Sequence, residues 1–315
     1  MPNDISYTPE EVANILKISK YTVYELIKRG ELTAYHIGRK VRVEKTDLEI
    51  YIQKAKTGDS FFAPEPSSLP SEQPKSSPLT DNGLVICGQD MVLDILTRQL
   101  EKQFPYIRCL RHYIGSIDGL TALYRGQANA VTAHLWDSDT DEYNIPYVRR
   151  MLPGHPATII NLVYRTEGFY VAQGNPKGIR TWEDLTKPDV RFINRERGSG
   201  ARVLLDEKLR VLKINHTAIQ GYAEEEMSHV AVASKVARGE ADVGLGIEKA
   251  SLQVNNLDFI PLQKERYDLV VRQEDLVKPH FQALLSILNS TAFRNDVLGI
   301  GGYDISQMGQ IIANV

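Results

Sequence analysis

The sequence predicts an α/β protein with a small N-terminal helix-turn-helix part and a larger part made of two α/β lobes. Three observations predict this architecture. Residues 7–56 show two short amphipathic helices followed by a hairpin and a further helix. Residues 58–82 are rich in proline and serine. From residue 83 onward, apolar strand-like runs alternate with helical patterns, which is typical of α/β lobes.

The composition is that of a globular protein. The 315 residues are 42% apolar and 24% charged, and no run approaches the roughly 18 apolar residues that a membrane helix needs. The N-terminus lacks the basic and apolar segments of a signal peptide, so we expect a cytoplasmic protein. Cys87 and Cys109 lie in apolar surroundings without metal-ligand spacing, which predicts buried, reduced thiols.

The first helix begins with a capping pattern. Thr8 is followed by Pro9 at the first helical position and by Glu11, the arrangement of a capping box. After a short turn, Ser19 can cap a second helix, and Gly30 supplies the residue that ends it. Two short helices joined by a tight turn are the helix-turn-helix pattern.

A basic hairpin follows the second helix. Apolar residues alternate over 32–36 and over 41–43, on either side of a turn at 38–40. This alternation predicts a two-stranded wing with a basic tip. Thr46 can then cap a last helix. Ten basic against eight acidic residues give residues 1–57 a formal charge of +2, in a chain whose net charge is −3.

The order helix, turn, helix, wing, helix resembles the excisionase-type, MerR-like winged helix family. The stretch TPEEVANILKISKYTVYELIKRGELTAYHIGRKVRVEKTDLEIYI carries this resemblance over its whole length. The second helix can enter a major groove of double-stranded DNA while basic side chains neutralise phosphates. We expect Ser19, Lys20, Tyr21, Thr22 and Tyr24 to face base edges, and Lys28, Arg39, Lys40 and Arg42 to face phosphates. Because so small a module reads few bases, we expect a homodimer or higher homo-oligomer on the operator.

The segment 58–82 separates the two folded parts. It holds five of the fifteen prolines and six serines, with almost nothing apolar after Phe62. Such a composition cannot offset the entropy cost of ordering, so we expect a flexible linker with an average span of roughly 25–30 Å. The predicted domains are therefore a DNA-binding domain at 1–57 and a ligand-binding domain at 83–315. Ligand control would then act through the oligomeric state or the relative placement of the ligand-binding domains.

The C-terminal part begins with strand–turn–helix units. A strand at 84–87 is followed by Gln89 and Asp90 and by a helix over 92–100, and the strand at 130–133 leads into His134. Further strands are predicted at 108–114, 158–172, 190–194, 218–222, 242–245, 258–262 and 267–271, a turn at 115–119, and helices at 120–125, 203–210, 230–238, 279–289 and near the C-terminus. Ligands bind outside the carboxyl ends of such strands.

The glycine-flanked Ser199 is the strongest predicted ligand site. Backbone N–H groups and a hydroxyl at a helix start favour an anion, because the helix dipole is positive there. Arg195, Arg197 and Arg202 add positive charge nearby. The alternative is a tight connection whose arginines form surface salt bridges.

Two lobes joined by two crossings resemble the periplasmic-binding-protein fold of the second type. The stretches IGSIDGLTALYRGQANAVTAHLWD, FINRERGSGARVLLDEKL, SHVAVASKVARGEADVGLGIEKA and DFIPLQKERYDLV are similar to molybdate- and tungstate-binding receptor domains that are fused to a helix-turn-helix. We expect lobe I at 83–165 and 266–315, and lobe II at 166–265. The resemblance implies that a tetrahedral anion is held by Ser116, Ser199, Gly200, Ala201, Ser228 and His229.

Gln89 and Asp90 depart from this family, whose members commonly present a hydroxyl after the first strand. An ionised Asp90 facing a dianion would lower affinity unless an arginine neutralised it. Asp90 therefore either caps its helix or faces a larger ligand with donor groups, such as a molybdenum-cofactor pterin or a phosphorylated metabolite. The predicted effector is molybdate or tungstate, with these larger ligands as the alternative.

The sequence carries no recognisable catalytic or metal motif. His134, Asp137, His155, Glu167 and His229 fit neither HExxH nor a related spacing. We therefore predict no enzyme, no cofactor and no metal, with a cofactor-handling enzyme and an architectural DNA-binding protein as alternatives. A ligand-responsive transcription regulator, which binds operator DNA and a small anion, explains both folded parts.

Overall fold

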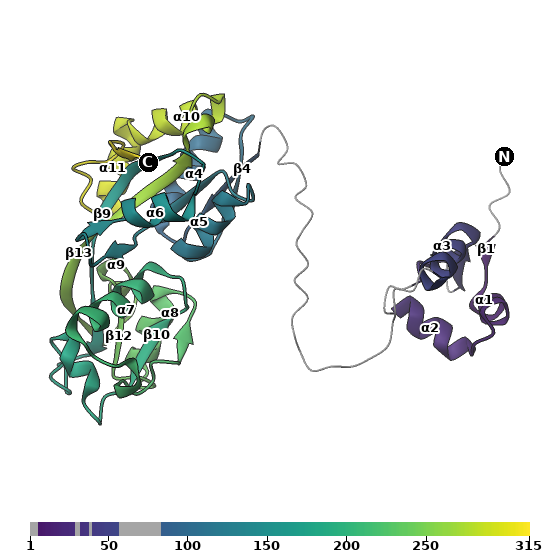
Figure 1. Cartoon of the computed structure of the whole chain (residues 1–315), viewed down its shortest axis with the longest axis horizontal. Coiled ribbons are helices and arrows are strands. Elements are labelled where there is room, and N and C mark those ends of the chain that lie inside the picture. The colour runs from purple at the N-terminus through teal and green to yellow at the C-terminus, as the bar shows by residue number, and fades with distance from the viewer. Residues whose placement is uncertain (1–5, 29–31, 38–39, 57–82) are drawn as a thin grey trace. The chain divides into compact units, whose positions relative to one another are not determined.

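The computed structural model describes residues 6–28, 32–37, 40–56 and 83–315, which form two compact units (Figure 1). The predicted linker, the helix-ending Gly30 and the wing-tip Arg39 lie outside these residues. Among the residues described, no helix combines the length and the apolar content needed to cross a membrane.

The N-terminal unit is a winged helix-turn-helix. Its helices are α1 (Pro9–Leu16), α2 (Lys20–Lys28) and α3 (Lys45–Lys56), and its antiparallel sheet has the order β1 (Ser6–Tyr7), β3 (Lys40–Glu44), β2 (Tyr35–Ile37). The predicted capping box is confirmed, because the Glu11 amide donates to Thr8 Oγ1 over 3.2 Å and the Thr8 amide donates to Glu11 Oε2 over 2.7 Å. The prediction that Thr46 caps α3 is wrong, since the helix already begins at Lys45. The core consists of Val12, Ala13, Val23, Leu26, Leu32, Val43 and Leu48.

Two long strands form the centre of the C-terminal unit. β9 (Ala157–Ala172) and β13 (Leu257–Arg272) pair antiparallel along their whole length and run through both lobes (Figure 1). The nine-stranded sheet has the order β11-β10-β12-β9-β13-β6-β4-β5, and β14 pairs with β9. Apolar, β-branched runs in β9 suit a strand that is covered on both faces.

The first lobe is a three-layer α/β structure. Its strands are β4 (Gly83–Cys87), β5 (Arg108–His112), β6 (Ala130–Ala133) and β14 (Ile311–Asn314), and its helices are α4 (Met91–Gln103), α5 (Ser116–Tyr124), α6 (Ile145–Met151), α10 (Pro279–Leu288) and α11 (Thr291–Ile300). α4, α10 and α11 pack in one core cluster, which contains Leu96 and Phe281. α5 and α6 pack in another, around Leu120 and Val148. A two-stranded ribbon, β7 (Trp136–Asp137) with β8 (Glu142–Tyr143), precedes α6.

The second lobe repeats this plan on a smaller scale. Its strands are β10 (Phe192–Arg195), β11 (Glu225–Glu226) and β12 (Val243–Ile247), its α-helices are α7 (Gly200–Leu212), α8 (His229–Ala237) and α9 (Glu248–Ser251), and 3-10 turns lie at Trp182–Thr186, His216–Ala218 and, in the first lobe, Gln273–Asp275. β10 lies parallel to both β11 and β12, as β4 lies parallel to both β5 and β6. The carboxyl ends of these parallel strands carry the loops that form the site.

Several predicted elements differ from the structure. The strand predicted at 218–222 is wrong, because this region holds the end of a 3-10 turn and β11 begins only at Glu225. The strands predicted at 258–262 and 267–271 are one strand, β13, with register shifts that absorb the break between them. The predicted turn at 115–119 is largely helical, since α5 starts at Ser116.

Candidate functional site between the two lobes

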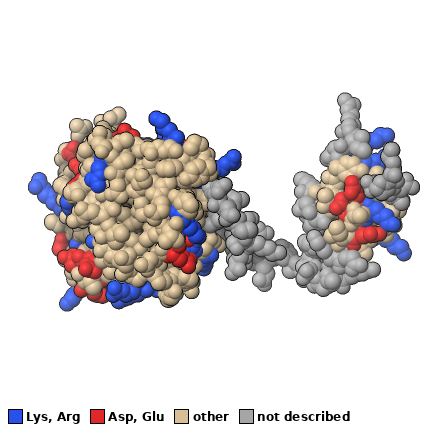
Figure 2. Space-filling model, turned by 90° about the horizontal axis from the view of Figure 1, so that it is seen from above, with Lys and Arg blue, Asp and Glu red and all other residues tan. Residues whose placement is uncertain are grey.

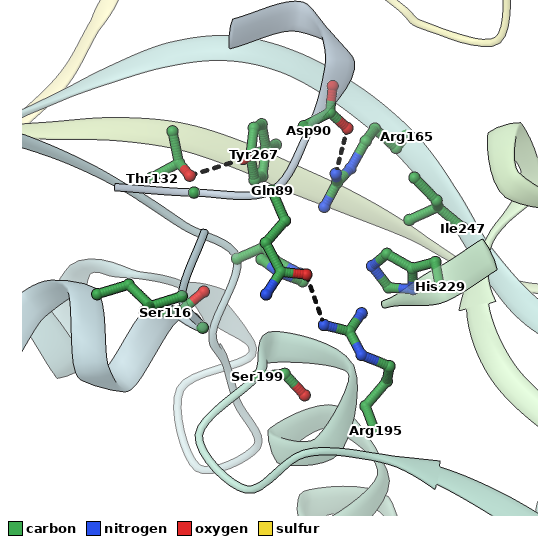
Figure 3. Close-up of a pocket in the computed structure, with 14 residues that line it drawn as sticks. Gln89, Asp90, Ser116, Thr132, Arg165, Arg195, Ser199, His229, Ile247 and Tyr267 are labelled. Atoms are coloured by element: carbon green, nitrogen blue, oxygen red, sulfur yellow. Dashed lines mark hydrogen bonds and ion pairs between the residues drawn. The ribbon is translucent and has the colours of Figure 1, made fainter. Parts of the chain in front are cut away.

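A small pocket of about 30 Å³ lies where the strand ends of the two lobes meet (Figure 3). The loops after β4, β5 and β6 line it from the first lobe, and the loops after β10 and β11 and the end of β12 line it from the second. The predicted residues that line it are Gln89, Asp90, Ser116, His134, Arg195, Ser199 and His229. Turn residues that are far apart in the sequence are therefore brought together.

Arg165, in β9, lies at the centre of a buried ion-pair network. Its guanidinium is 2.5 Å from Asp90 Oδ2, contacts a carboxylate oxygen of Glu265, and stacks 4.0 Å from the ring centroid of Tyr267. The three charged side chains are at most 3% exposed. Since buried charges are stable only when paired, Arg165 and its carboxylates depend on one another.

Asp90 caps its helix, as one of the two interpretations of the sequence expected, and it also lines the pocket. Its Oδ1 accepts from the Val92 amide over 2.8 Å and from Tyr303 Oη over 2.8 Å, while Oδ2 faces Arg165. Both carboxylate oxygens are thus engaged, and an arginine offsets the charge. The expected repulsion of an anion by Asp90 is therefore reduced.

Arg195 joins the two lobes across the pocket. Its Nη2 donates to Gln89 Oε1 over 2.8 Å (Figure 3). Its Nε and Nη2 also donate to Glu196 over 2.7 and 2.8 Å. Arg195 Nη1 donates to none of the residues described, although the side chain lines the pocket. A further contact joins the lobes where the Ile117 amide donates to the Gly198 carbonyl over 3.0 Å. The pocket is thus closed around a small volume, with an arginine N–H still able to donate.

The two predicted serines differ in what their hydroxyls do. Ser199 Oγ donates to the Glu196 carbonyl over 2.9 Å and accepts from the Arg202 amide over 3.3 Å, so it caps α7. Ser116 is 3% exposed, lines the pocket, and forms no hydrogen bond through its hydroxyl within the described part of the chain. α5 has Gly115 at its N-cap and so no capping side chain. The Ile117 amide in the first turn is already bound to Gly198, and the Ser116 hydroxyl and the remaining first-turn donors can hold a ligand anion.

A histidine–carboxyl cluster lies beside Arg165. His134 Nδ1 is 2.8 Å from Glu265 Oε2, and Glu167 is fully buried against Glu265. Burial and the neighbouring Glu265 raise the pKa of Glu167 well above its usual range. Burial alone would also raise the pKa of Glu265, but Arg165 and His134 bring it below its usual range. Burial, Arg195 and Arg165 lower the pKa of His229, which keeps its imidazole neutral at neutral pH.

Five predicted ligand residues lie outside this pocket. Arg197 is 83% exposed and faces Glu225, so its prediction as a ligand residue is wrong. Arg202 is buried against Glu225, Asp206 and the Tyr222 ring, because α7 begins earlier than predicted and turns this side chain away. The other three residues have structural roles. Gly200 leaves room for the His134 ring, because a Cβ atom at this position would lie 2.4 Å from that ring. Ala201 packs in the second-lobe core, and Ser228 caps α8.

Sequence reasoning missed most of the residues that the long strands contribute, and it named Glu167 only as a side chain that fits no catalytic or metal motif. The long strands β9 and β13 contribute Arg165, Glu167, Glu265 and Tyr267. A further residue, Thr132, belongs to β6, and its hydroxyl forms a hydrogen bond with the Tyr267 hydroxyl at 2.6 Å. The sequence did contain a sign of these residues, because charged side chains interrupt the otherwise apolar runs that form the two long strands. Their partners could not be identified without the register of the two strands.

The predicted recognition helix presents an exposed polar face. Tyr21 is 75% and Tyr24 44% exposed, and Ser19 and Thr22 are exposed as well. Ser19 Oγ accepts from the Thr22 amide over 3.1 Å, so this hydroxyl caps α2. Lys20 pairs with an acidic side chain of α1 at 3.2 Å. The tyrosines are therefore the freest candidates for base contacts on this helix.

On the predicted wing, the structure describes fewer of the candidate DNA-binding residues than on the recognition helix. Lys40 is exposed and Arg42 half-buried on β3, whereas the side chain of Lys28 and all of Arg39 lie outside the described residues. Figure 2 shows both signs of charge on the visible face of each unit. Phosphate binding by this unit would thus depend on a few local cations.

Comparisons with known proteins agree with this architecture. The profile of the PBP superfamily domain matches residues 97–289, and that of a helix-turn-helix domain matches residues 6–56. The uncharacterized protein YvgK of Bacillus subtilis strain 168 is 43% identical over 310 residues, which cover 98% of this chain and 97% of that protein. The molybdate-binding protein ModA of Mycobacterium tuberculosis strain H37Rv is 27% identical over 196 residues, which cover 60% of this chain and 69% of ModA.

Solved structures show the same fold in the C-terminal unit. A substrate-binding protein with bound phosphate from Clostridium perfringens superposes with a TM-score of 0.53 and 13% identity, over 71% of this chain and 99% of that chain. The N-terminal helix-turn-helix and the two-lobed α/β fold predicted from the sequence are thus confirmed. This chain belongs to the PBP superfamily, as a member with a helix-turn-helix domain at its N-terminus.

Proposed function

We propose that this protein is a cytoplasmic transcription regulator that binds operator DNA through residues 1–57 and a small tetrahedral oxyanion, molybdate or tungstate, through residues 83–315. The observation that carries the ligand proposal is Ser116, whose unpaired hydroxyl faces the pocket from the uncapped start of α5. Helix starts and hydroxyls hold anions without any need for an additional formal charge. The similarity to ModA supports an oxyanion of this kind.

The size of the pocket favours a small ligand over a pterin. The closed pocket measures about 30 Å³, which leaves space for a few atoms between the lobes. A pterin or a phosphorylated metabolite would require the Gln89–Arg195 contact across the pocket to open. We therefore place these larger ligands second.

The ligand proposal predicts a specific thermal shift. Molybdate or tungstate should raise the melting temperature of the full chain, since a ligand at about 100 times its Kd adds roughly 2.7 kcal/mol to the free energy of unfolding. Ser116→Ala should weaken binding about tenfold or more, because it removes a hydrogen bond to a charged acceptor. Thermal unfolding with and without molybdate, tungstate, sulfate or phosphate measures the first effect, and calorimetric titration with the same anions measures the second.

Ser286→Ala is the matched control for this experiment, since Ser286 is exposed on α10, away from the pocket. Its affinity for the oxyanion should equal that of the wild type. A response to a pterin or a nucleotide, with none to any oxyanion, would refute the ligand assignment and leave the fold unaffected.

DNA binding predicts a separate, salt-dependent effect. Replacing Lys40 and Arg42 with alanine should lower affinity for an operator selected from random-sequence DNA. It should also reduce the salt slope of log K by about 0.9 for each phosphate that the variant no longer neutralises. Lys102→Ala, in α4, is the control. Unchanged affinity and slope in the double variant would remove the wing from the interface.

We further propose that a homodimer is the DNA-binding species. A single winged unit of this size buries little surface on DNA, whereas a dimer reads two half-sites. The proline- and serine-rich segment 58–82 joins the two domains in the sequence, and in a dimer the ligand-binding domains would set the spacing of the DNA-binding domains.

A further inference from the structure

A group of metal-ligand side chains lies on the strands that join the lobes. His134 follows β6, Glu167 belongs to β9 and Glu265 to β13, and one potential ligand atom from each lies within 4.8 Å of the others. Glu167 and Glu265 are 0% exposed. A cluster held by three strands has little freedom to move, which is what a metal site needs.

Glu167 is the residue of this cluster whose surroundings indicate that a further group binds here. Neither of its carboxylate oxygens has a hydrogen-bond donor among the described residues, although the side chain is completely buried. Its neighbour Glu265 is another acid and already binds Arg165 and His134. A buried carboxylate without a donor is costly, so this position calls for a proton or a cation.

The local charges favour a divalent cation. Once Glu167 is ionised, it opposes the single positive charge of Arg165 together with Asp90 and Glu265. The neighbouring Arg195 does not change this balance, because it is paired with Glu196. A divalent ion would neutralise the excess charge of the three carboxylates.

We infer that His134, Glu167 and Glu265 bind a divalent transition-metal ion of the Zn²⁺ or Mn²⁺ class. One imidazole and two carboxylates suit these ions, and three protein ligands leave a coordination position open. Of the three proposed ligands, His134 lines the pocket, whereas Glu167 and Glu265 are buried and do not line it. This inference goes beyond the proposed function and does not depend on which anion the pocket binds.

Carboxylates and imidazoles bind a metal ion only in their deprotonated forms, so the affinity should increase as the pH rises. A metal that binds only to surface histidines would not depend on Glu167 in this way.

The test uses the full chain, stripped with EDTA, dialysed, and titrated calorimetrically with Zn²⁺ and then separately with Mn²⁺. One equivalent per chain should bind to the wild type, and elemental analysis after desalting should recover it. Glu167→Gln should weaken binding by about tenfold to a hundredfold or more, at least as much as loss of a supporting residue around a metal.

Glu240→Gln is the matched control, since Glu240 is an exposed carboxylate paired with Arg238. It should bind metal like the wild type. His134→Asn is a second test variant in case Glu167→Gln unfolds. Absence of binding at one equivalent, or equal affinity in Glu167→Gln and Glu240→Gln, would overturn the inference. The titrations contain no oxyanion, so their failure would leave the proposed oxyanion site untouched.

Discussion

Replacing Arg165 with methionine should lower the free energy of unfolding of the C-terminal unit by about 3–5 kcal/mol, because it leaves buried carboxylates without their counterion. Arg165 holds Asp90 Oδ2 at 2.5 Å and contacts Glu265, and all three side chains are almost completely buried. Methionine keeps much of the volume and removes the charge. Urea unfolding followed by circular dichroism measures the change.

Two variants test whether charge is the cause. Arg210→Met removes a half-exposed arginine that pairs with Asp139 and Glu207, and it should cost no more than about 1 kcal/mol, as surface pairs do. Adding Asp90→Asn to Arg165→Met should restore part of the lost stability, since it removes one of the unpaired charges. Equal losses for Arg165→Met and Arg210→Met would show that the buried network contributes little.

Local patterns were enough to predict most of the fold. The strand predicted at 158–172 is found as β9 (Ala157–Ala172), because a long β-branched run has few other stable conformations. The strand predicted at 218–222 failed because a short apolar segment can equally enter a 3-10 turn, as this one does in part. Helix starts were placed a few residues late at α5 and α7, where glycine and serine resemble a turn as much as a cap.

The site was predictable only where it follows strand ends. Ser116, Arg195 and Ser199 could be found because residues at the carboxyl ends of parallel strands converge. The Arg165–Glu265 pair could not be found in this way, since it depends on the register in which β9 meets β13 across the sheet. The buried ion pairs of the site therefore depend on contacts between residues far apart in the sequence, whereas the residues at the strand ends follow from local sequence patterns.

Glu167→Gln should stabilise the metal-free protein increasingly as the pH rises. In the unfolded chain Glu167 ionises at its ordinary pKa, whereas burial and Glu265 raise its pKa in the folded state. Between those two values the unfolded state releases a proton that the folded state keeps, so the wild type loses about 1.4 kcal/mol of stability per pH unit from this group. Glutamine cannot ionise and avoids this loss.

Urea unfolding in EDTA, at steps between about pH 5 and pH 8, measures this difference directly. The gap between Glu167→Gln and the wild type should widen with pH, and it should stop widening above the folded pKa of Glu167. Glu240→Gln should show no such trend, because Glu240 is exposed and its pairing with Arg238 lowers its pKa. A gap that is constant over this range would mean that Glu167 is already ionised in the folded, metal-free protein. The buried cluster would then carry its full negative charge without a proton, and a cation would be needed for its stability rather than only for binding.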